Sequence, residues 1–228
     1  MKKIHFETID STNNLAKEMI RSGDFEHGTL ITADMQTGGR GRNNRVFAST
    51  GGMYMSLLLD ARNINFPITP AAAVATAKTV AETTDLSLSI KWVNDLIYAG
   101  KKVCGILTEA VTDENGSLKG FVCGIGLNTQ NTILPDSLKD IATVLPISKD
   151  GLAEKIASSL LDYYECNTDI LPMYKEKLLL NIPIDVYQND VFLFSGIATD
   201  INENGNLIVK TENETRVLTS GEISIKLS

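Results

Sequence analysis

Short stretches of the chain alternate apolar with polar residues or are continuously apolar, as is typical of β-strands. Turn residues follow most of these stretches, and the Ala99-Gly100 pair between two of them predicts a hairpin. The segment Asn128–Pro146 lacks both patterns, so we expect a loop there. The predicted strands are Lys3–Thr8, Thr29–Ala33, Met53–Leu59, Leu86–Trp92, Asn94–Tyr98, Val103–Val111 and Lys119–Leu127.

Two helices are predicted in the first half of the chain, where apolar residues recur at helical spacing. Either Ser11 or Thr12 is a suitable N-cap for the first helix, and Gly23 is a suitable stop. The second helix is rich in alanine and ends near Thr84. We expect its Pro70 at the first helical position, where the missing N–H costs nothing.

Two more helices and a small all-β module are predicted in the second half. Ser148 is expected to cap the third helix, and the fourth covers roughly Ile170–Leu180. After Asn181-Ile182-Pro183 the pattern changes to short strands separated by turn residues, the spacing of a compact barrel. These strands are Ile184–Tyr187, Val191–Ile201, Leu207–Lys210, Thr215–Leu218 and Ile223–Leu227.

Composition narrows the class of protein. With 228 residues, 43% of them hydrophobic, the chain can bury a substantial core in one large or two modest domains. A net charge of -7 argues against a general nucleic-acid binder, which is usually basic. The start resembles no signal peptide, and no apolar run is long enough to span a bilayer. Three cysteines without C-x-x-C spacing suggest reduced thiols in the cytoplasm, and two isolated histidines are too few for a metal site or a Ser-His relay.

The stretch Gly38–Arg45 reverses the acidic character of the chain, because it holds three arginines and three glycines but no carboxylate. Glycine lets backbone N–H groups approach a ligand, and the guanidinium fork matches carboxylate and phosphate oxygens. The stretch has no apolar residue to bury, so we expect it to be mobile alone and to order around a small anion. A solvated turn and an arginine–glycine patch for RNA are the alternatives that this stretch leaves open.

The stretch Lys91–Asp95 places a cation, an amide and a carboxylate between apolar segments. Asparagine and aspartate oxygens at a strand end suit Mg²⁺ bound together with phosphates. The alternative is a turn held by these two side chains. Lys101 and Lys102 follow at a hairpin tip, where we expect Lys101 to be solvated and Lys102 to turn toward the sheet face.

Three more stretches offer polar groups. Gly124-x-Gly126-x-Asn128 ends a strand, where glycines permit close backbone approach, although no helix follows as a dinucleotide fold requires. Ser11-Thr12-Asn13 combines a helix cap with a place for small polar groups. The amide of Gln36, just before the arginine-rich stretch, can read a polar ring.

Taken together and in this order, these motifs resemble those of biotin protein ligases, and the resemblance covers essentially the whole chain. Each motif alone is weak, but the arginine-rich stretch combined with the Lys-Trp-x-Asn-Asp block is highly specific. The motifs are Ser11-Thr12-Asn13, Gln36-x-x-Gly39-Arg40-Gly41-Arg42-x-x-Arg45, Lys91-Trp92-x-Asn94-Asp95-Leu96, Lys102-x-x-Gly105-Ile106-Leu107-x-Glu109, Gly124-x-Gly126-x-Asn128 and Gly221-Glu222-Ile223-Ser224.

The resemblance implies an α+β fold, with a mixed β-sheet catalytic domain and flanking helices over residues 1–181 and an SH3-like barrel over residues 182–228. It implies that biotin and ATP, with Mg²⁺, give biotinyl-5′-AMP and pyrophosphate, and that a lysine of a biotin carboxyl carrier domain then takes the biotin. Because the chain begins almost directly at the catalytic domain, it resembles the monofunctional class without a DNA-binding domain. We therefore expect a cytoplasmic enzyme without specific DNA or membrane binding, and a homodimer is compatible with the resemblance.

The resemblance also implies residue roles, which agree with an in-line displacement that needs cations and no protein nucleophile. The catalytic residues are Lys102 and Arg40. Biotin is bound by Ser11, Thr12, Asn13, Gln36, Gly39, Arg40, Lys102 and Gly105. ATP is bound by Arg42, Arg45, Phe47, Lys91, Asn94 and Asn128, and Asp95 is the candidate Mg²⁺ ligand.

The sequence departs from the family pattern at three positions. Phe47 stands where the family usually has an adenine-stacking Trp, Val93 where it has Pro, and Lys226 where it has a C-terminal Arg. These changes reduce the stacking area, loosen a turn and put a nucleotide contact from the barrel in doubt. Two alternative functions are a lipoate or octanoate protein ligase and a non-enzymatic module with a basic loop that binds a small ligand or RNA.

Overall fold

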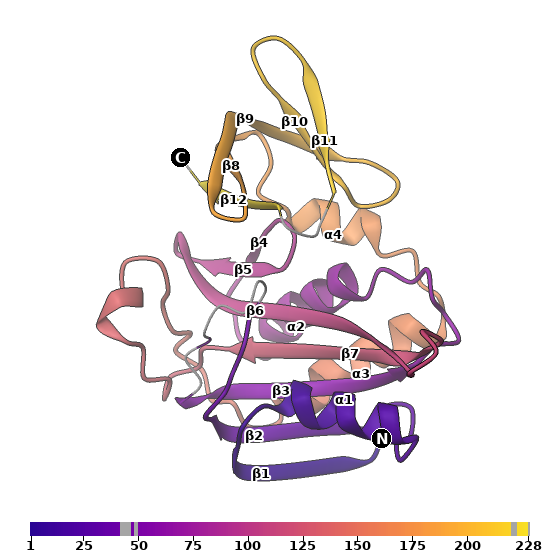
Figure 1. Cartoon of the computed structure of the whole chain (residues 1–228). Helices are drawn as coiled ribbons and strands as arrows, with labels where there is room; N and C mark the ends of the chain where they lie inside the picture. Colours follow the sequence, from indigo (N-terminus) through magenta and orange to yellow (C-terminus); the bar gives the residue numbers. More distant parts are fainter. Residues whose placement is uncertain (42–46, 48–49, 220–222, 228) are drawn as a thin grey trace.

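A large mixed sheet forms the base of the molecule in the computed structural model, which describes residues 1–41, 47, 50–219 and 223–227 (Figure 1). Among these residues, seven strands follow the order β1-β2-β3-β7-β6-β5-β4. β1 runs parallel to β2 and the other neighbours are antiparallel, which confirms the mixed sheet of the predicted α+β fold. The strands are β1 Lys3–Ile9, β2 Leu30–Gln36, β3 Thr50–Asp60, β4 Ser89–Lys91, β5 Asp95–Tyr98, β6 Lys101–Thr112 and β7 Leu118–Leu127.

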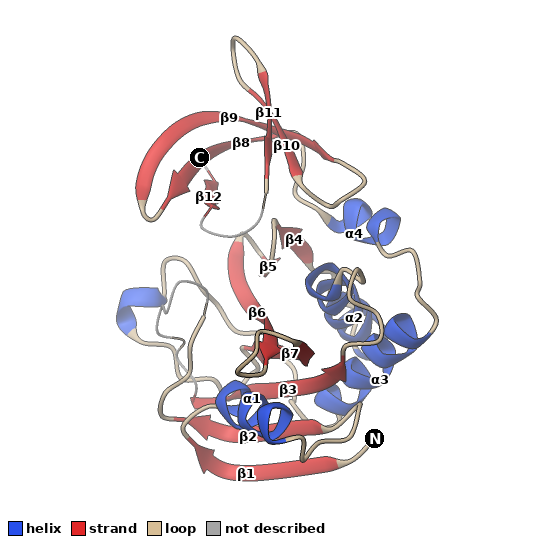
Figure 2. Ribbon diagram, turned by 45° about the vertical axis from the view of Figure 1, so that its right-hand side comes forward, coloured by secondary structure: helices blue, strands red, loops and turns tan. Residues whose placement is uncertain are grey.

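Helices lie on both faces of this sheet, with α1 on one face and α2 and α3 on the other (Figure 2). The first helix begins as predicted, because the side chain of Ser11 accepts a hydrogen bond from the backbone N–H of Asn14. It ends at Gly23, which adopts φ 77° and donates its N–H to the carbonyl of Ile20. The helices are α1 Thr12–Ser22, α2 Ile68–Thr83, α3 Leu152–Glu165 and α4 Leu171–Lys177.

The two faces are covered unequally. On the side of α2 and α3 the sheet packs into a continuous apolar core, because the alanines of α2 let this helix approach the sheet closely. On the other side, α1 covers only one end of the face. Its apolar contacts there involve Ala16, Ile20, Ile31, Leu58, Val111 and Val122. The remainder of this face is left for polar residues and glycines.

A second, antiparallel sheet follows at the top of Figure 1, with the strand order β11-β10-β9-β8-β12. The predicted barrel does not close within the described residues, since no ladder there joins β11 to β12. The indole Nε1–H of Trp92 donates to the carbonyl of Gly205 at 3.0 Å and links the two sheets. The strands are β8 Ile182–Gln188, β9 Val191–Ile201, β10 Leu207–Lys210, β11 Thr215–Leu218 and β12 Ile223–Leu227.

Three predicted helix ends are wrong. Helix α2 begins two residues earlier than expected, so Pro70 is its third residue, a position whose N–H also has no partner within the helix. Helix α3 begins after Gly151, and Ser148 shapes the preceding turn by accepting the N–H of Asp150. Helix α4 ends at Lys177, because the next residues extend and bridge to β4.

Two other predictions require correction. The hairpin predicted at Ala99-Gly100 is confirmed, with both residues at positive φ, but Lys101 and Lys102 are the first residues of β6 and not the hairpin tip. The segment predicted as a loop after Asn128 contains the short 3-10 helix η2, Asp136–Leu138. This segment also pairs with the start of β6.

The cysteines are free, as predicted. Cys104 and Cys123 are buried in the sheet, and burial raises the pKa of the Cys123 thiol to about 12. The pKa of Cys104 is raised further by the same cause. Only Cys166 is exposed. No helix in the described ranges is long and apolar enough to cross a membrane.

Candidate active site

The floor of the candidate site is a cross-strand row that includes two small residues, Ser56 and Gly124. Ser56 of β3 lies opposite Gly124 of β7, and Gly124 lies opposite Leu107 of β6. The side-chain amide of Asn13 on α1 occupies the space above Gly124, where an added Cβ would lie 2.2 Å from Asn13 Oδ1. A glycine is therefore required here for α1 to insert its amide into the sheet face.

Hydrogen bonds tie the first residues of α1 to two strands. The oxygen Oε1 of Gln36, at the end of β2, accepts the backbone N–H of Thr12 at 2.8 Å and lies 3.1 Å from Thr12 Oγ1. The hydroxyl of Ser56 lies 2.6 Å from Asn13 Oδ1 and 2.8 Å from Thr12 Oγ1. Ser11, Thr12, Asn13 and Ser56 are all buried. The structure thus brings together four predicted site residues, Ser11, Thr12, Asn13 and Gln36, as one polar end of the site.

Two charged residues continue this polar end, and the sequence prediction assigned neither of them a role. Asn13 Nδ2 donates to Glu109 Oε2 at 2.8 Å, and Glu109 Oε1 lies 2.8 Å from Lys17 Nζ. Glu109 and Lys17 are both less than a third exposed. The signal in the sequence was present for Glu109, which closes the Lys102 motif on a strand, and for Ser56, a polar residue inside an apolar run.

Next to this row, a pair of glycines lets an aromatic ring lie directly on the sheet surface. Gly126 of β7 lies opposite Gly105 of β6, and the ring of Phe47 covers both positions, since an added Cβ on Gly126 would lie 2.5 Å from Phe47 Cε1. The backbone N–H of Phe47 donates to the carbonyl of Gly39 at 3.0 Å, and its ring meets Tyr54 edge-on. Burial raises the pKa of Tyr54 to about 12, so its phenol stays neutral.

The far end of the glycine pair carries two ammonium groups and a carboxylate. Asp95 of β5 lies opposite Gly105, and its Oδ1 is 2.6 Å from Lys102 Nζ. Its Oδ2 is 4.0 Å from Lys91 Nζ. An added Cβ on Gly105 would lie 3.2 Å from Lys102 Nζ, so this ammonium lies beside the glycine floor as expected. The backbone N–H of Lys102 donates to the carbonyl of Ile141, and the carbonyl of Lys102 accepts the N–H of Thr143.

Lys101 differs from the expectation of a solvated side chain. Its Nζ donates to the carbonyl of Lys139 at 2.6 Å, and the side chain is only partly exposed. The first two residues of β6 therefore have different partners, with Lys101 bound to the segment after η2 and Lys102 bound to Asp95.

The two predicted asparagines hold the backbone of the site together. Asn94 Nδ2 donates to the carbonyl of Ile106 at 2.7 Å, which ties the approach to β5 to strand β6. Asn128 is buried, and its Nδ2 donates to the carbonyl of Thr143 at 3.1 Å. Both amides have a structural task in this arrangement.

Of the predicted arginines, only Arg40 is described, and it is exposed. Arg42 and Arg45 lie outside the described residues, together with the predicted ordering of their stretch around an anion. Lys226, which replaces the expected C-terminal arginine, lies with its Nζ 4.2 Å from the centre of the Tyr187 ring on the second sheet.

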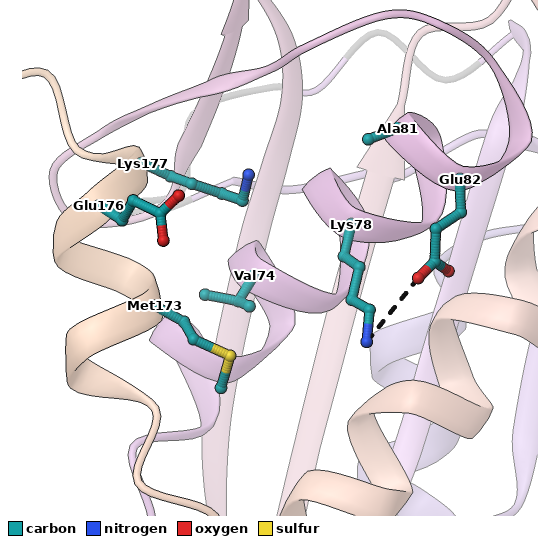
Figure 3. Close-up of a pocket in the computed structure, with 7 residues that line it drawn as sticks. All are labelled: Val74, Lys78, Ala81, Glu82, Met173, Glu176 and Lys177. Carbon is teal, nitrogen blue, oxygen red and sulfur yellow. Dashed lines mark ion pairs between the residues drawn. The ribbon is translucent and has the colours of Figure 1, made fainter.

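A shallow groove of about 350 Å³ between α2 and α4 holds none of the predicted site residues (Figure 3). It lies on the α2 side of the sheet, and Lys78 in its wall is paired with Glu82 at 3.7 Å. Because the predicted site residues lie elsewhere, we place the candidate site on the opposite face of the sheet. The groove is lined by Val74, Lys78, Ala81, Glu82, Met173, Glu176 and Lys177.

Two family models match the chain. The model described as "Biotin/lipoate A/B protein ligase family" matches residues 5–128, which include all the predicted site residues. The model described as "Biotin protein ligase C terminal domain" matches residues 180–226, which include the second sheet apart from its last residue.

Similar proteins extend these matches over nearly the whole chain. The bifunctional ligase/repressor BirA of Bacillus subtilis is 32% identical over 97% of this chain and 73% of its own length. The biotin–[acetyl-CoA-carboxylase] ligase of Mycobacterium tuberculosis is 26% identical over 93% of this chain and 85% of its own. A solved structure of the biotin protein ligase from Aquifex aeolicus with biotin and ATP covers 100% of this chain and 99% of its own, with a TM-score of 0.83 and 26% identity.

Proposed function

This chain belongs to the biotin/lipoate A/B protein ligase family, and on that premise we propose that it activates biotin with ATP and transfers the biotinyl group to a protein lysine. In the first step a biotin carboxylate oxygen attacks the α-phosphate and pyrophosphate leaves, which gives biotinyl-5′-AMP. In the second step the lysine amine attacks the acyl carbon and AMP leaves. One observation carries the proposal: a glycine pair, covered by the Phe47 ring and next to Lys102, joins a buried polar end to a pair of ammonium groups.

The polar end suits the ring of biotin. Thr12, Asn13 and Gln36 offer neutral donors and acceptors that are already held in place by hydrogen bonds. A urea-containing ring is neutral and needs both kinds of partner, so it can replace the water that would otherwise solvate these groups. The glycine pair then gives a flat surface, directed toward Lys102, on which the valeryl chain can lie once the Phe47 ring that covers it here moves aside.

The ammonium end suits the reaction centre. Negative charge collects on the carboxylate and the α-phosphate in the transition state, and a fixed cation stabilises that charge without reorganisation. Lys102 is held by Asp95 and by its backbone bonds to the neighbouring segment, so its ammonium is positioned before the ligands arrive. The buried thiols Cys104 and Cys123 cannot serve as nucleophiles, and the proposed reaction requires none.

The remaining roles are proposals that follow from position and chemistry. Arg40 binds the carboxylate and adenylate phosphate, and Gly39 allows the backbone to approach the ligand. Phe47 covers the floor beside Lys102 and stacks on adenine with less area than a tryptophan would. Lys91 neutralises phosphate charge, as do Arg42 and Arg45. Asn94 and Asn128 are better suited to supporting the site than to contacting ATP, because their amides already bind carbonyl groups.

Magnesium is proposed to arrive with the ATP phosphates. Asp95 does not fit as its protein ligand in this arrangement, because each carboxylate oxygen faces a lysine ammonium. The described part of the chain contains no cluster of three or more His, Cys, Asp or Glu suited to a metal ion. The carboxylate of Asp95 is better explained as the partner that positions Lys102.

Lipoate or octanoate protein ligation is the alternative within the same family. An alkyl chain or a dithiolane ring leaves buried donors and acceptors unpaired, which costs free energy. The hydrogen-bonded polar end therefore favours biotin. We further propose a cytoplasmic enzyme that acts on a biotin carboxyl carrier domain, without specific DNA binding, since the net charge of -7 disfavours DNA. A homodimer is compatible with this proposal.

The purified chain is expected to biotinylate an isolated biotin carboxyl carrier domain with ATP, and to transfer neither lipoate nor octanoate at a comparable rate. The assay follows the mass of the carrier domain, with an acceptor Lys→Arg variant of that domain as the control. Modification by lipoate or octanoate at the rate found for biotin would contradict the proposed substrate.

A further inference from the structure

A series of hydrogen bonds links Lys17 to Thr12 through Glu109, Asn13 and Ser56. Glu109 determines which atom donates and which accepts in each of these bonds. A glutamate carboxylate salt-bridged to a lysine only accepts hydrogen bonds. The atom of Asn13 that faces it at 2.8 Å must therefore be the donor Nδ2. The carbonyl of Leu107, 3.4 Å from the same nitrogen, favours the same orientation. The amide of Asn13 is thus oriented with its oxygen toward Ser56.

This orientation decides where the hydroxyl protons lie. Ser56 Oγ is 2.6 Å from Asn13 Oδ1, and since that oxygen can only accept, Ser56 donates its proton there. Thr12 Oγ1 then has two oxygen neighbours, Ser56 Oγ at 2.8 Å and Gln36 Oε1 at 3.1 Å. Because the Ser56 proton is given to Asn13, only the Thr12 proton can lie between the two hydroxyl oxygens, so Thr12 donates to the closer Ser56.

We propose that Glu109 is a positioning residue that fixes the Thr12 hydroxyl as a hydrogen-bond acceptor and thereby selects a ligand that presents a ring N–H. The inference rests on the proposed function, because it takes Thr12 as a residue that contacts the biotin ring. Thr12 donates its proton to Ser56, so its hydroxyl has only lone pairs left to offer a ligand. Lys17 supports this arrangement by binding Oε1 of Glu109, the carboxylate oxygen that Asn13 does not contact.

Replacing Glu109 by Gln removes the fixed direction while keeping the shape of the side chain. The Gln amide can donate to Asn13 Oδ1, which lets the Asn13 amide turn over and present Nδ2 to Ser56. Ser56 then donates to Thr12, and the Thr12 proton is released toward the ligand. The variant can therefore accept either a donor or an acceptor at this position of the ring.

The test measures dissociation constants for biotin and for the two isosteric carbamates in which one ring N–H is replaced by oxygen. We expect the unmodified chain to bind at least one carbamate about 100-fold more weakly than biotin, because the ring oxygen of that carbamate, an acceptor, then faces the accepting hydroxyl oxygen of Thr12. Glu109→Gln is expected to reduce this ratio by tenfold or more. Ser56→Ala, which also frees the Thr12 proton, is expected to reduce it in the same direction and provides the test if Glu109→Gln does not fold.

Asp113→Asn is the matched control, because Asp113 forms the same kind of ion pair with Lys119 at 3.0 Å near the turn between β6 and β7. It should leave the ratio unchanged. The inference would be overturned if folded Glu109→Gln or Ser56→Ala discriminated between biotin and the carbamate as strongly as the unmodified chain does. Equal binding of biotin and both carbamates by the unmodified chain would also overturn it. Failure of the unmodified chain to bind biotin at all would instead overturn the proposed function on which it rests.

Discussion

Replacement of Lys102 by Gln is expected to slow the formation of biotinyl-5′-AMP by on the order of 10²–10³-fold, the usual effect of losing one preorganised charge-stabilising group. The side chain keeps its length and polarity but loses the ammonium that Asp95 holds beside the glycine floor. Because negative charge on the α-phosphate is greatest in the transition state, the loss should fall on the rate. Biotin affinity should change far less. The measurement is single-turnover formation of the adenylate, with biotin affinity determined separately.

Lys101→Gln is the matched control for this experiment. Lys101 is adjacent in sequence and also begins β6, but its ammonium binds the carbonyl of Lys139 and not Asp95. We expect its adenylation rate to stay within about threefold of the unmodified chain, since an exposed or rim cation contributes little. A normal rate in Lys102→Gln, or a damaged rate in Lys101→Gln, would show that the catalytic lysine has been assigned wrongly.

Replacement of Gly124 by Ala is expected to weaken biotin binding by roughly tenfold to hundredfold, since overpacking typically costs about 1–3 kcal/mol. The new methyl group would lie 2.2 Å from Asn13 Oδ1, so the Asn13 amide must leave its place between Ser56 and Glu109. Calorimetric titration with biotin measures the effect, and thermal unfolding shows whether the fold remains intact.

Gly105→Ala provides a graded comparison on the neighbouring strand. Its methyl group would approach the flexible end of Lys102 at 3.2–3.3 Å, and that end can move by a few tenths of an ångström. We therefore expect a smaller loss of biotin affinity than for Gly124→Ala. Equal losses in the two variants would mean that the polar row around Asn13 has no special importance for the ligand.

Much of the fold could be predicted from the sequence because local patterns decide it. The alternation of apolar residues located the strands, and Ser11 and Gly23 marked the ends of α1. The end of α4 depended on a tertiary contact, the bridge between Leu178 and Ile90, that no local signal reports. Closure of the barrel also depends on long-range pairing, and β11 and β12 are not joined among the described residues.

The sequence predicted the motifs of the candidate site, but not the hydrogen bonds and ion pairs that connect their residues. Thr12, Asn13 and Gln36 were recognised singly, but their connection through Ser56 follows from the register that sets Ser56 opposite Gly124. Asp95 was predicted as a metal ligand, and its ion pair with Lys102, which follows from the pairing of β5 with β6, was not predicted. Register between distant strands is set by the whole sheet, so these contacts required the structure.

Biotin-dependent exchange of pyrophosphate into ATP tests the central claim most directly, because it detects reversible adenylation by the purified chain without any carrier protein. We expect exchange that requires biotin, that lipoate or octanoate at equal concentration does not support, and that is lost in Lys102→Gln. Exchange driven by lipoate or octanoate as efficiently as by biotin, or no acid-dependent exchange at all, would contradict the account.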